Sequence, residues 1–233
     1  MNLEFWREIV YLSGKVSLVT LIIISLLSVF RIRRIPSSLK PLVYYIFATF
    51  ITELLVYILF NYYSFSEETY YLVNKFYGIA EIIFLGFFFY IHIHKTSLKR
   101  LSLSISTLLF LLYLFKLITA PGGNDEYLSV ILSAGHLLIC LILLSGLARE
   151  KPGLNFSGRP EVSVVLLLIL SYTLIILIFI FMPGIVNYSR ILANQIEIFR
   201  IFLGIFFYIV CYMTLRRSSH QPHLQRLNHR FRR

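Results

Sequence analysis

Seven long apolar stretches, each separated from the next by a short polar segment, occupy nearly the whole chain of 233 residues. An α-helix needs about 20 mostly apolar residues to cross the hydrocarbon core of a bilayer. Each stretch has that length, so the sequence predicts an all-α membrane protein. The expected spans are 8–30, 42–62, 70–92, 101–120, 127–147, 162–183 and 190–215.

Composition excludes the common classes of soluble protein. The chain is 58% hydrophobic and only 14% charged, whereas soluble domains carry about 25% charged residues. A cytosolic enzyme, a secreted disulfide scaffold and a disordered regulator are all excluded. We expect a single transmembrane domain over 1–215, followed by a basic tail over 216–233.

Basic residues alternate between the two sides of the expected bundle. One set of connections and the tail holds Arg31, Arg33, Arg34, Lys40, Lys95, Lys99, Arg100, Arg149, Lys151, Arg159, Arg216, Arg217, Arg226, Arg230, Arg232 and Arg233. The opposite set is acidic overall and holds Glu4, Arg7, Glu8, Glu67, Glu68, Asp125, Glu126 and Arg190. Because basic connections stay cytoplasmic, we expect the N-terminus outside and the C-terminus in the cytoplasm. The inner membrane of a Gram-negative bacterium, or another plasma membrane, suits this plan.

The two halves of the chain resemble each other at an offset of about 118–120 residues. Residues 82–91 align with 200–209, and shorter matches near Leu12 and Leu21 keep the same order. The alternative is chance similarity between Phe-, Leu- and Ile-rich helices. We expect helices 1–3 to be a parallel copy of helices 5–7, with helix 4 as the linker, which is one of the known transporter plans.

This 3+1+3 plan resembles the SWEET and PQ-loop proteins and the microbial rhodopsins. The mid-helix prolines of SWEET hinges are absent, and the seventh helix lacks a retinal-binding lysine, its deep basic residue being Arg200. The run Thr52-Glu53, followed by Asn74, Tyr77, Glu81 and Tyr90, more closely resembles a group of small, uncharacterised bacterial seven-helix proteins. That resemblance implies no activity.

Polar residues inside the spans are the candidate functional groups. Placing an ionisable side chain in the bilayer costs free energy, so such a residue is by default expected to have a function. Glu53, Glu81 and Arg200 fall near the midplane of their spans. The others in the outer half are Lys15, Lys75, Lys116, His136, Asn194 and Glu197. The inner halves carry almost no ionisable group, so we expect a vestibule that opens outside and closes near the midplane.

Spacing arranges several of these residues in stripes. Asn194, Glu197 and Arg200 share one face of helix 7, and Asn74, Tyr77 and Glu81 share one face of helix 3. We expect both stripes to face the bundle interior. Glu81 or Glu53 is the preferred ion-pair partner of Arg200, and Glu197 is the alternative within the same helix.

Three interpretations of these charges remain open. They form an ion-pair network that only fixes helix packing, they bind a polar or anionic solute, or Glu53 or Glu81 carries a proton. Lys15, Lys75 and Lys116 exceed what pairing requires, which favours the solute.

Other residues give weaker signals. The tyrosines near span ends, including Tyr44, Tyr45, Tyr70 and Tyr71, are typical of an interfacial aromatic belt. His92 and His94 lack a metal-ligand spacing with the tail histidines, and Cys140 and Cys211 fit core packing. Catalytic and nucleotide-binding motifs are absent, so we expect neither an enzyme nor a cofactor.

The sequence favours a sensor or receptor-like module that binds a small polar or anionic ligand from outside. It would pass its state to a cytoplasmic signalling partner through the basic loops and tail. The alternative is a SWEET-like or proton-coupled transporter of small solutes. An apolar inner half favours the sensor, since a transporter needs a polar route on both sides of the midplane.

Overall fold

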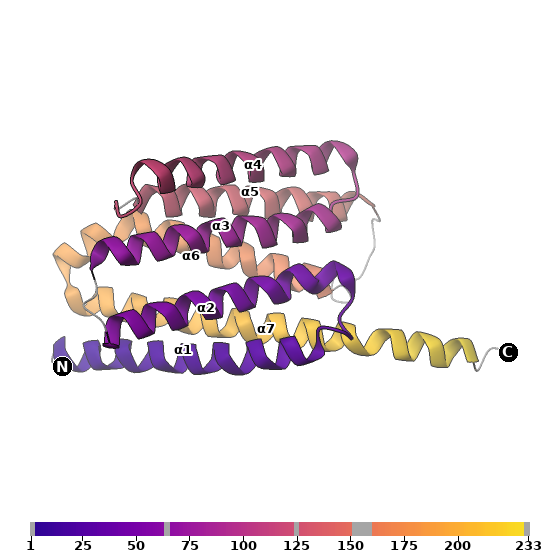
Figure 1. Cartoon of the computed structure of the whole chain (residues 1–233), viewed down its shortest axis with the longest axis horizontal. Coiled ribbons are helices and arrows are strands. Elements are labelled where there is room, and N and C mark those ends of the chain that lie inside the picture. The colour runs from indigo at the N-terminus through magenta and orange to yellow at the C-terminus, as the bar shows by residue number, and fades with distance from the viewer. Residues whose placement is uncertain (1–2, 63–65, 124–125, 151–159, 231–233) are drawn as a thin grey trace.

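A computed structural model describes residues 3–62, 66–123, 126–150 and 160–230. The described chain is helical (Figure 1). Its helices are α1 (Leu3–Arg31), the short 3₁₀ helix η1 (Ser37–Leu39), α2 (Lys40–Tyr62), α3 (Glu67–His92), α4 (Thr96–Thr119), α5 (Glu126–Glu150), α6 (Pro160–Tyr188) and α7 (Arg190–Arg230).

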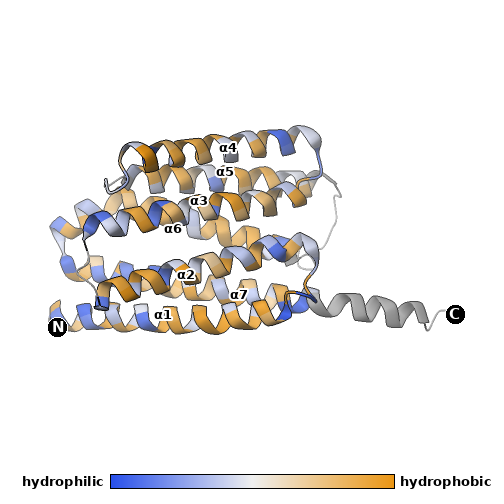
Figure 2. Cartoon of the chain, viewed as in Figure 1, coloured by the Kyte–Doolittle hydropathy of each residue, from blue (hydrophilic) through white to orange (hydrophobic). Residues whose placement is uncertain are grey.

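Seven helices of the described chain are long and apolar enough to cross a membrane. The prediction of an all-α, multi-pass membrane protein is therefore confirmed. Large apolar side chains such as Phe30, Leu108 and Ile118 lie on the outer surface, and apolar residues cover the length of the bundle in Figure 2. Such a surface suits contact with a lipid bilayer.

The helices form a closed ring in which each one packs against the next, and α1 packs against α7 to close it. α3 also packs directly against α5, so α4 lies outside these two helices. α1 in turn lies against α2 and α7, and these three helices lie side by side in Figure 1. The interior cavity described below is lined mainly by α2, α3, α5, α6 and α7, and α1 contributes no described residue to it.

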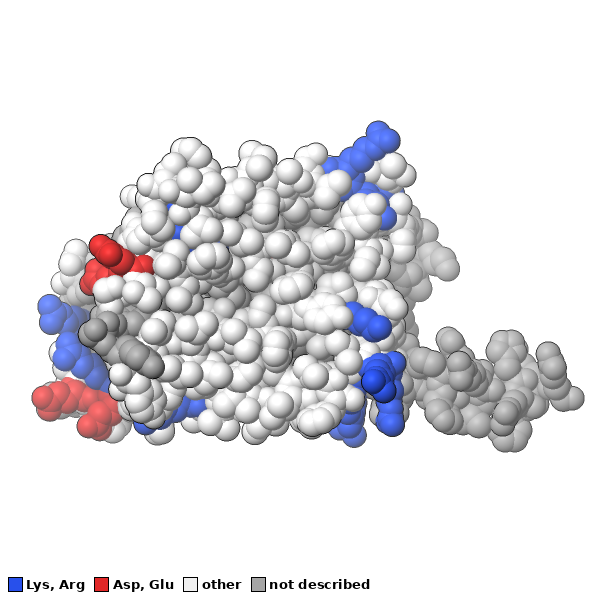
Figure 3. All heavy atoms as spheres, viewed as in Figure 1, with Lys and Arg blue, Asp and Glu red and all other residues white. Residues whose placement is uncertain are grey.

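Charged side chains gather at the two ends of the bundle. In Figure 3 the visible acidic residues lie at the end that holds the N-terminus, and the face between the ends is nearly free of charge. Asp125, Lys151, Arg159, Arg232 and Arg233, which contribute to the expected orientation, lie outside the described residues.

Two helices are longer than the expected spans. α6 continues through Pro183 and Gly184 to Tyr188, although these residues are the expected connection to the next helix. A proline removes one backbone hydrogen bond and strains one turn, and the helix resumes after it, with the amide of Ser189 still bonded to the carbonyl of Ile185. The connection lies instead at Ser189, whose hydroxyl accepts a hydrogen bond from the amide of Leu192 and caps α7.

α7 continues as a helix to Arg230, past the end of the candidate span at Ser218. In Figure 1 its last turns extend beyond the rest of the bundle. The part expected as a separate tail is therefore helical where the structure describes it. Side chains are described only as far as Ser218, so the tail histidines and arginines beyond it are placed as helix positions alone.

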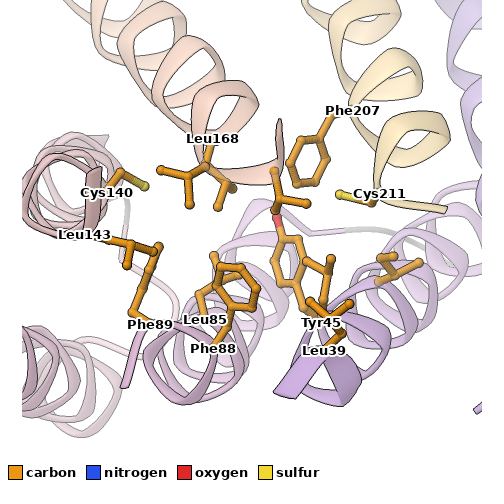
Figure 4. Close-up of a cluster of buried hydrophobic side chains, with 14 of the residues drawn as sticks. Leu39, Tyr45, Leu85, Phe88, Phe89, Cys140, Leu143, Leu168, Phe207 and Cys211 are labelled. Carbon is orange, nitrogen blue, oxygen red and sulfur yellow. The ribbon is translucent and has the colours of Figure 1, made fainter. Parts of the chain in front are cut away.

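A large apolar core fills the half of the bundle farther from the N-terminus. It joins Leu39 and Leu42 near the start of α2 with Phe88 and Phe89 near the end of α3 and Leu215 of α7. Figure 4 shows side chains of α2, α3, α5, α6 and α7 converging there. Cys140 and Cys211 are fully buried in this core as free thiols, as expected.

Candidate functional site

A cavity of about 990 Å³ lies inside the bundle, and its deep end reaches into the apolar core. Its walls come from α2, α3, α5, α6 and α7, with Tyr113 of α4 closing a gap between α3 and α5. The polar lining residues are Tyr45, Thr49, Thr52, Glu53, Tyr70, Tyr71, Asn74, Lys75, Tyr77, Glu81, Tyr113, Ser129, Ser133, Ser171, Tyr172, Asn187, Glu197, Arg200 and Tyr208.

The residues that line the cavity run from the end of the bundle that holds the N-terminus to deep within it. Tyr70 and Asn187, near the ends of α3 and α6, line its mouth. Tyr208 lies 18 residues beyond the start of α7, a depth of about 27 Å at 1.5 Å per residue. Tyr45, Leu168 and Phe207 belong both to the lining and to the apolar core, so the core forms the floor.

Seven of the eleven candidate residues line this single cavity. They are Glu53, Asn74, Lys75, Tyr77, Glu81, Glu197 and Arg200. They come from α2, α3 and α7, which are separate in sequence. These polar residues, which the sequence predicts to lie within the membrane, thus line the same cavity from different helices.

The other four candidates, Lys15, Lys116, His136 and Asn194, do not line it. Lys15 lies on α1, outside the inner wall, with its ammonium 4.2 Å from the ring centre of Tyr11. Lys116 and Asn194 are half-buried on α4 and α7, and His136 is fully buried behind the wall. Depth alone did not reveal which side of a helix these residues occupy.

Arg200 pairs with Glu197, and the preference for Glu81 or Glu53 as its partner is wrong. Its Nε lies 2.9 Å from Oε2 of Glu197, and its Nη2 lies 2.5 Å from Oε1. Residues three apart on a helix are neighbours before any tertiary contact forms, so this bidentate pair needs no alignment of separate helices. Both side chains line the cavity, where they form a neutral pair.

Lys75 is hydrogen-bonded to backbone carbonyls at the C-terminal end of α4. Its ammonium donates to the backbone carbonyl of Ala120, to that of Pro121 at 3.2 Å and to that of Gly123 at 2.9 Å. These carbonyls lie at the C-terminus of a helix, where backbone acceptors lack helical partners and a cation is favourable. Lys75 is only 4% exposed. Lys75 therefore already has partners in the folded chain, contrary to the expectation that it is an extra positive charge available to a solute.

Glu81 lies at the deep end of the cavity and is bound by a tyrosine from the opposite wall. The hydroxyl of Tyr172 donates a hydrogen bond to Oε1 of Glu81 at 2.5 Å. Nδ1 of His136 lies 3.7 Å from the same oxygen, too far for a hydrogen bond. The His136 ring stacks on Tyr172 with centroids 5.2 Å apart. Among the described residues, neither of its ring nitrogens has a hydrogen-bond partner.

Tyrosine hydroxyls extend the polar surface beside Glu81. Tyr77 donates to the hydroxyl of Tyr45 at 3.2 Å and receives a bond from Thr49 at 3.5 Å. Tyr208 lies close enough to both Glu53 and Glu81 for their charges to act on it. Within the described chain, neither Tyr208 nor Glu53 makes a hydrogen bond or ion pair.

Sequence reasoning missed most of these tyrosines. Tyr45, Tyr70 and Tyr71 line the cavity although they were expected in an interfacial belt, whereas Tyr44 is 45% exposed on the outer surface. A helical stripe indicates them: Tyr45, Thr49 and Glu53 recur every four residues on α2. The same spacing continues the α7 stripe from Arg200 through Gly204 to Tyr208.

No group of three His, Cys, Asp or Glu side chains among the described residues could hold a metal ion. Comparison of the chain with protein-family models, with curated proteins and with solved structures finds no match. The functional assignment therefore depends on the geometry of this cavity.

Proposed function

We propose that the protein is a receptor-like membrane module without enzymatic activity, which binds a small polar ligand in this cavity. With the orientation expected from its basic loops, the mouth faces outward and the floor lies toward the cytoplasm. The single observation that carries the proposal is a cavity with many polar lining residues that runs from the end holding the N-terminus into an apolar core.

The apolar core favours a receptor over a transporter. Below the floor, fully buried Leu85, Phe88, Leu143 and Leu215 fill the space between the same helices that line the cavity. Interiors packed in this way resist small displacements. A transporter would have to separate these side chains and expose them to its polar cargo, whereas a receptor requires only a shift of the helices.

α7 supplies the connection from cavity to cytoplasm. One uninterrupted helix carries Glu197, Arg200 and Tyr208 on the wall, Leu215 in the core and Arg217 at the basic end. A ligand that displaces the part of α7 that lines the cavity therefore also displaces the basic end of this helix. We propose that this end, with the basic loops, is what a cytoplasmic signalling partner recognises.

The coupling can be tested without knowing the ligand. In a chain with Cys140→Ala and Cys211→Ala, Tyr208→Cys is alkylated with a bulky maleimide that occupies the floor of the cavity. Hydrogen exchange of the backbone amides in residues 209–218 is then compared with that of the unmodified chain. The account predicts a change in exchange there. Alkylation of Phe202→Cys, on the exposed face of the same helix, should leave it unaltered.

Equal hydrogen exchange in the alkylated and unmodified Tyr208→Cys chains would refute the coupling.

Transport is tested in a separate assay. Radiolabelled sugars, amino acids and amines are offered to proteoliposomes. Accumulation of any of them that Glu81→Gln abolishes would establish the transporter instead.

A further inference from the structure

The charged groups in the cavity differ in how far they are compensated. The lining holds three carboxylates, Glu53, Glu81 and Glu197, and two basic groups, Lys75 and Arg200. Arg200 is paired with Glu197, and Lys75 is bound to three carbonyls. The carboxylates of Glu53 and Glu81 thus exceed the cations that remain available to them.

Glu81 is the less compensated of the two. Glu53 has Arg200 close enough for its charge to act on it, and this attraction exceeds the repulsion from Glu197. The described groups that hydrogen-bond to the Glu81 carboxyl are neutral hydroxyls, those of Tyr172 and Tyr77. The imidazole of His136, at 3.7 Å, lies beyond hydrogen-bond distance. A carboxylate this deep in a membrane protein normally has a cationic partner.

The surroundings of Glu81 have the composition of a cation site. Four tyrosines line the deep end beside it: Tyr45, Tyr77, Tyr172 and Tyr208. Tyrosine rings attract ammonium groups through their electron-rich faces, and assemblies of such rings recognise organic ammonium ions. Their hydroxyl oxygens also accept hydrogen bonds from an N–H donor.

We propose that the ligand is a small organic cation whose ammonium group lies against Glu81 among these four tyrosines. This inference rests on the proposed function, because it names the ligand class of the same cavity. Glu53, on α2, supplies a second negative charge to the lining of the same cavity. The cavity of about 990 Å³ is far larger than a bare metal ion requires, which agrees with an organic cation.

An anionic ligand, one of the classes expected from the sequence, fits this lining less well. It would have to displace Glu197 from Arg200 or draw Lys75 away from the end of α4. It would also approach Glu53 and Glu81 without a free cation to offset them. Each of these steps opposes binding.

The test uses two probes of nearly equal shape. Choline carries a quaternary ammonium, and 3,3-dimethylbutan-1-ol replaces its nitrogen with carbon and is neutral. Thermal unfolding of the full-length protein in detergent is followed with each probe, together with butylammonium and spermidine. A ligand that binds the folded state raises the unfolding temperature. We expect at least one ammonium probe to raise it and the neutral alcohol to leave it unchanged.

Variants locate the site. Glu81→Gln keeps an oxygen that can accept from Tyr172 but removes the charge, and should weaken ammonium binding at least about tenfold. Glu8→Gln changes an exposed carboxylate on α1 and should leave binding unchanged. Arg200→Gln frees the charge of Glu197 within the cavity and should tighten ammonium binding several-fold, whereas an anion site would respond in the opposite direction.

The outcomes separate the two proposals. Equal shifts with choline and its neutral isostere, or no shift with any ammonium probe, would overturn the ammonium inference. If externally added thiol reagents still reach Tyr208→Cys in that case, the cavity and the proposed receptor role remain. If they do not reach it, both proposals fail. Weaker ammonium binding in Arg200→Gln would also contradict the inference.

Discussion

The hydroxyl of Tyr172 donates a 2.5 Å hydrogen bond to Oε1 of Glu81. The bond joins α6 to α3, two helices that line the cavity but are not neighbours in the ring. Glu81 is 6% exposed and Tyr172 is 4% exposed. This polar contact therefore links two walls of the cavity at its deep end.

Tyr172→Phe removes this bond and leaves a buried carboxylate with one partner fewer. Hydrogen bonds to charged groups contribute about 1.5–3 kcal/mol, although bonds between helices in membranes average nearer 0.6 kcal/mol. We expect a loss of about 1–2 kcal/mol in the free energy of unfolding, measured in mixed micelles. Tyr127→Phe changes a tyrosine that is 85% exposed and serves as the control. Equal stability of the two variants would show that the bond contributes nothing.

His136 lies outside the cavity lining, so on the proposed function it supports the wall. It is fully buried, stacks on Tyr172 and has two ring nitrogens without hydrogen-bond partners. His136→Phe keeps an aromatic ring and removes both unsatisfied atoms, so we expect unfolding stability no lower than that of the native chain. His136→Ala leaves a void and should cost about 2–4 kcal/mol. Loss of choline binding in a stable His136→Phe variant would place the imidazole in the site after all.

Lys75 stabilises the end of α4. Lys75→Met keeps the aliphatic stem but removes the ammonium donor from the carbonyls of Ala120, Pro121 and Gly123. Of these, Ala120 keeps a bond from the amide of Gly123. An unsatisfied buried group costs about 1–3 kcal/mol. These carbonyls are only partly buried, so thermal unfolding should show a loss near the lower end of that range. Lys15→Met, at an exposed position on α1, should change stability far less. A stable Lys75→Met chain with altered ligand binding would instead favour a direct binding role.

Gly78 permits the close approach of α3 and α4 beside the cavity. A Cβ at this position would lie 2.8 Å from Cζ of Tyr113, which is 4% exposed. Gly78→Ala must therefore displace a buried ring, and we expect a loss of about 1–3 kcal/mol. At Gly14 an added Cβ meets nothing within 4 Å, so Gly14→Ala should be neutral or stabilising, by up to about 1 kcal/mol. Thermal unfolding of both variants is followed by circular dichroism. Equal losses of stability in Gly78→Ala and Gly14→Ala would contradict the packing argument.

The number of helices could be predicted because bilayer thickness and composition dictate it. The candidate site could be predicted only in part, since depth along a helix follows from position whereas the direction of each side chain depends on how helices rotate against one another. Lys15 and Glu53 illustrate this: both are charged and within spans, yet α1 lies outside the inner wall and α2 forms part of it.

Partner choice was harder to predict for a related reason. Arg200 and Glu81 match in depth, but the contact between Arg200 and Glu197 is local to α7 and forms without tertiary alignment. The tyrosines of the cavity could not be recognised as lining residues, because tyrosine is also typical of the membrane interface. Pro183 likewise indicates a helix end in sequence, yet it lies within α6.

The most direct test of the central claim is two-sided thiol labelling of Tyr208→Cys in a chain lacking Cys140 and Cys211. A membrane-impermeant reagent is applied to intact cells and to inverted vesicles, with Leu215→Cys as the control in the sealed core. The account predicts labelling of position 208 from the outside only, and no labelling of position 215 from either side. Labelling of position 208 from both sides would contradict the closed floor and favour a transporter.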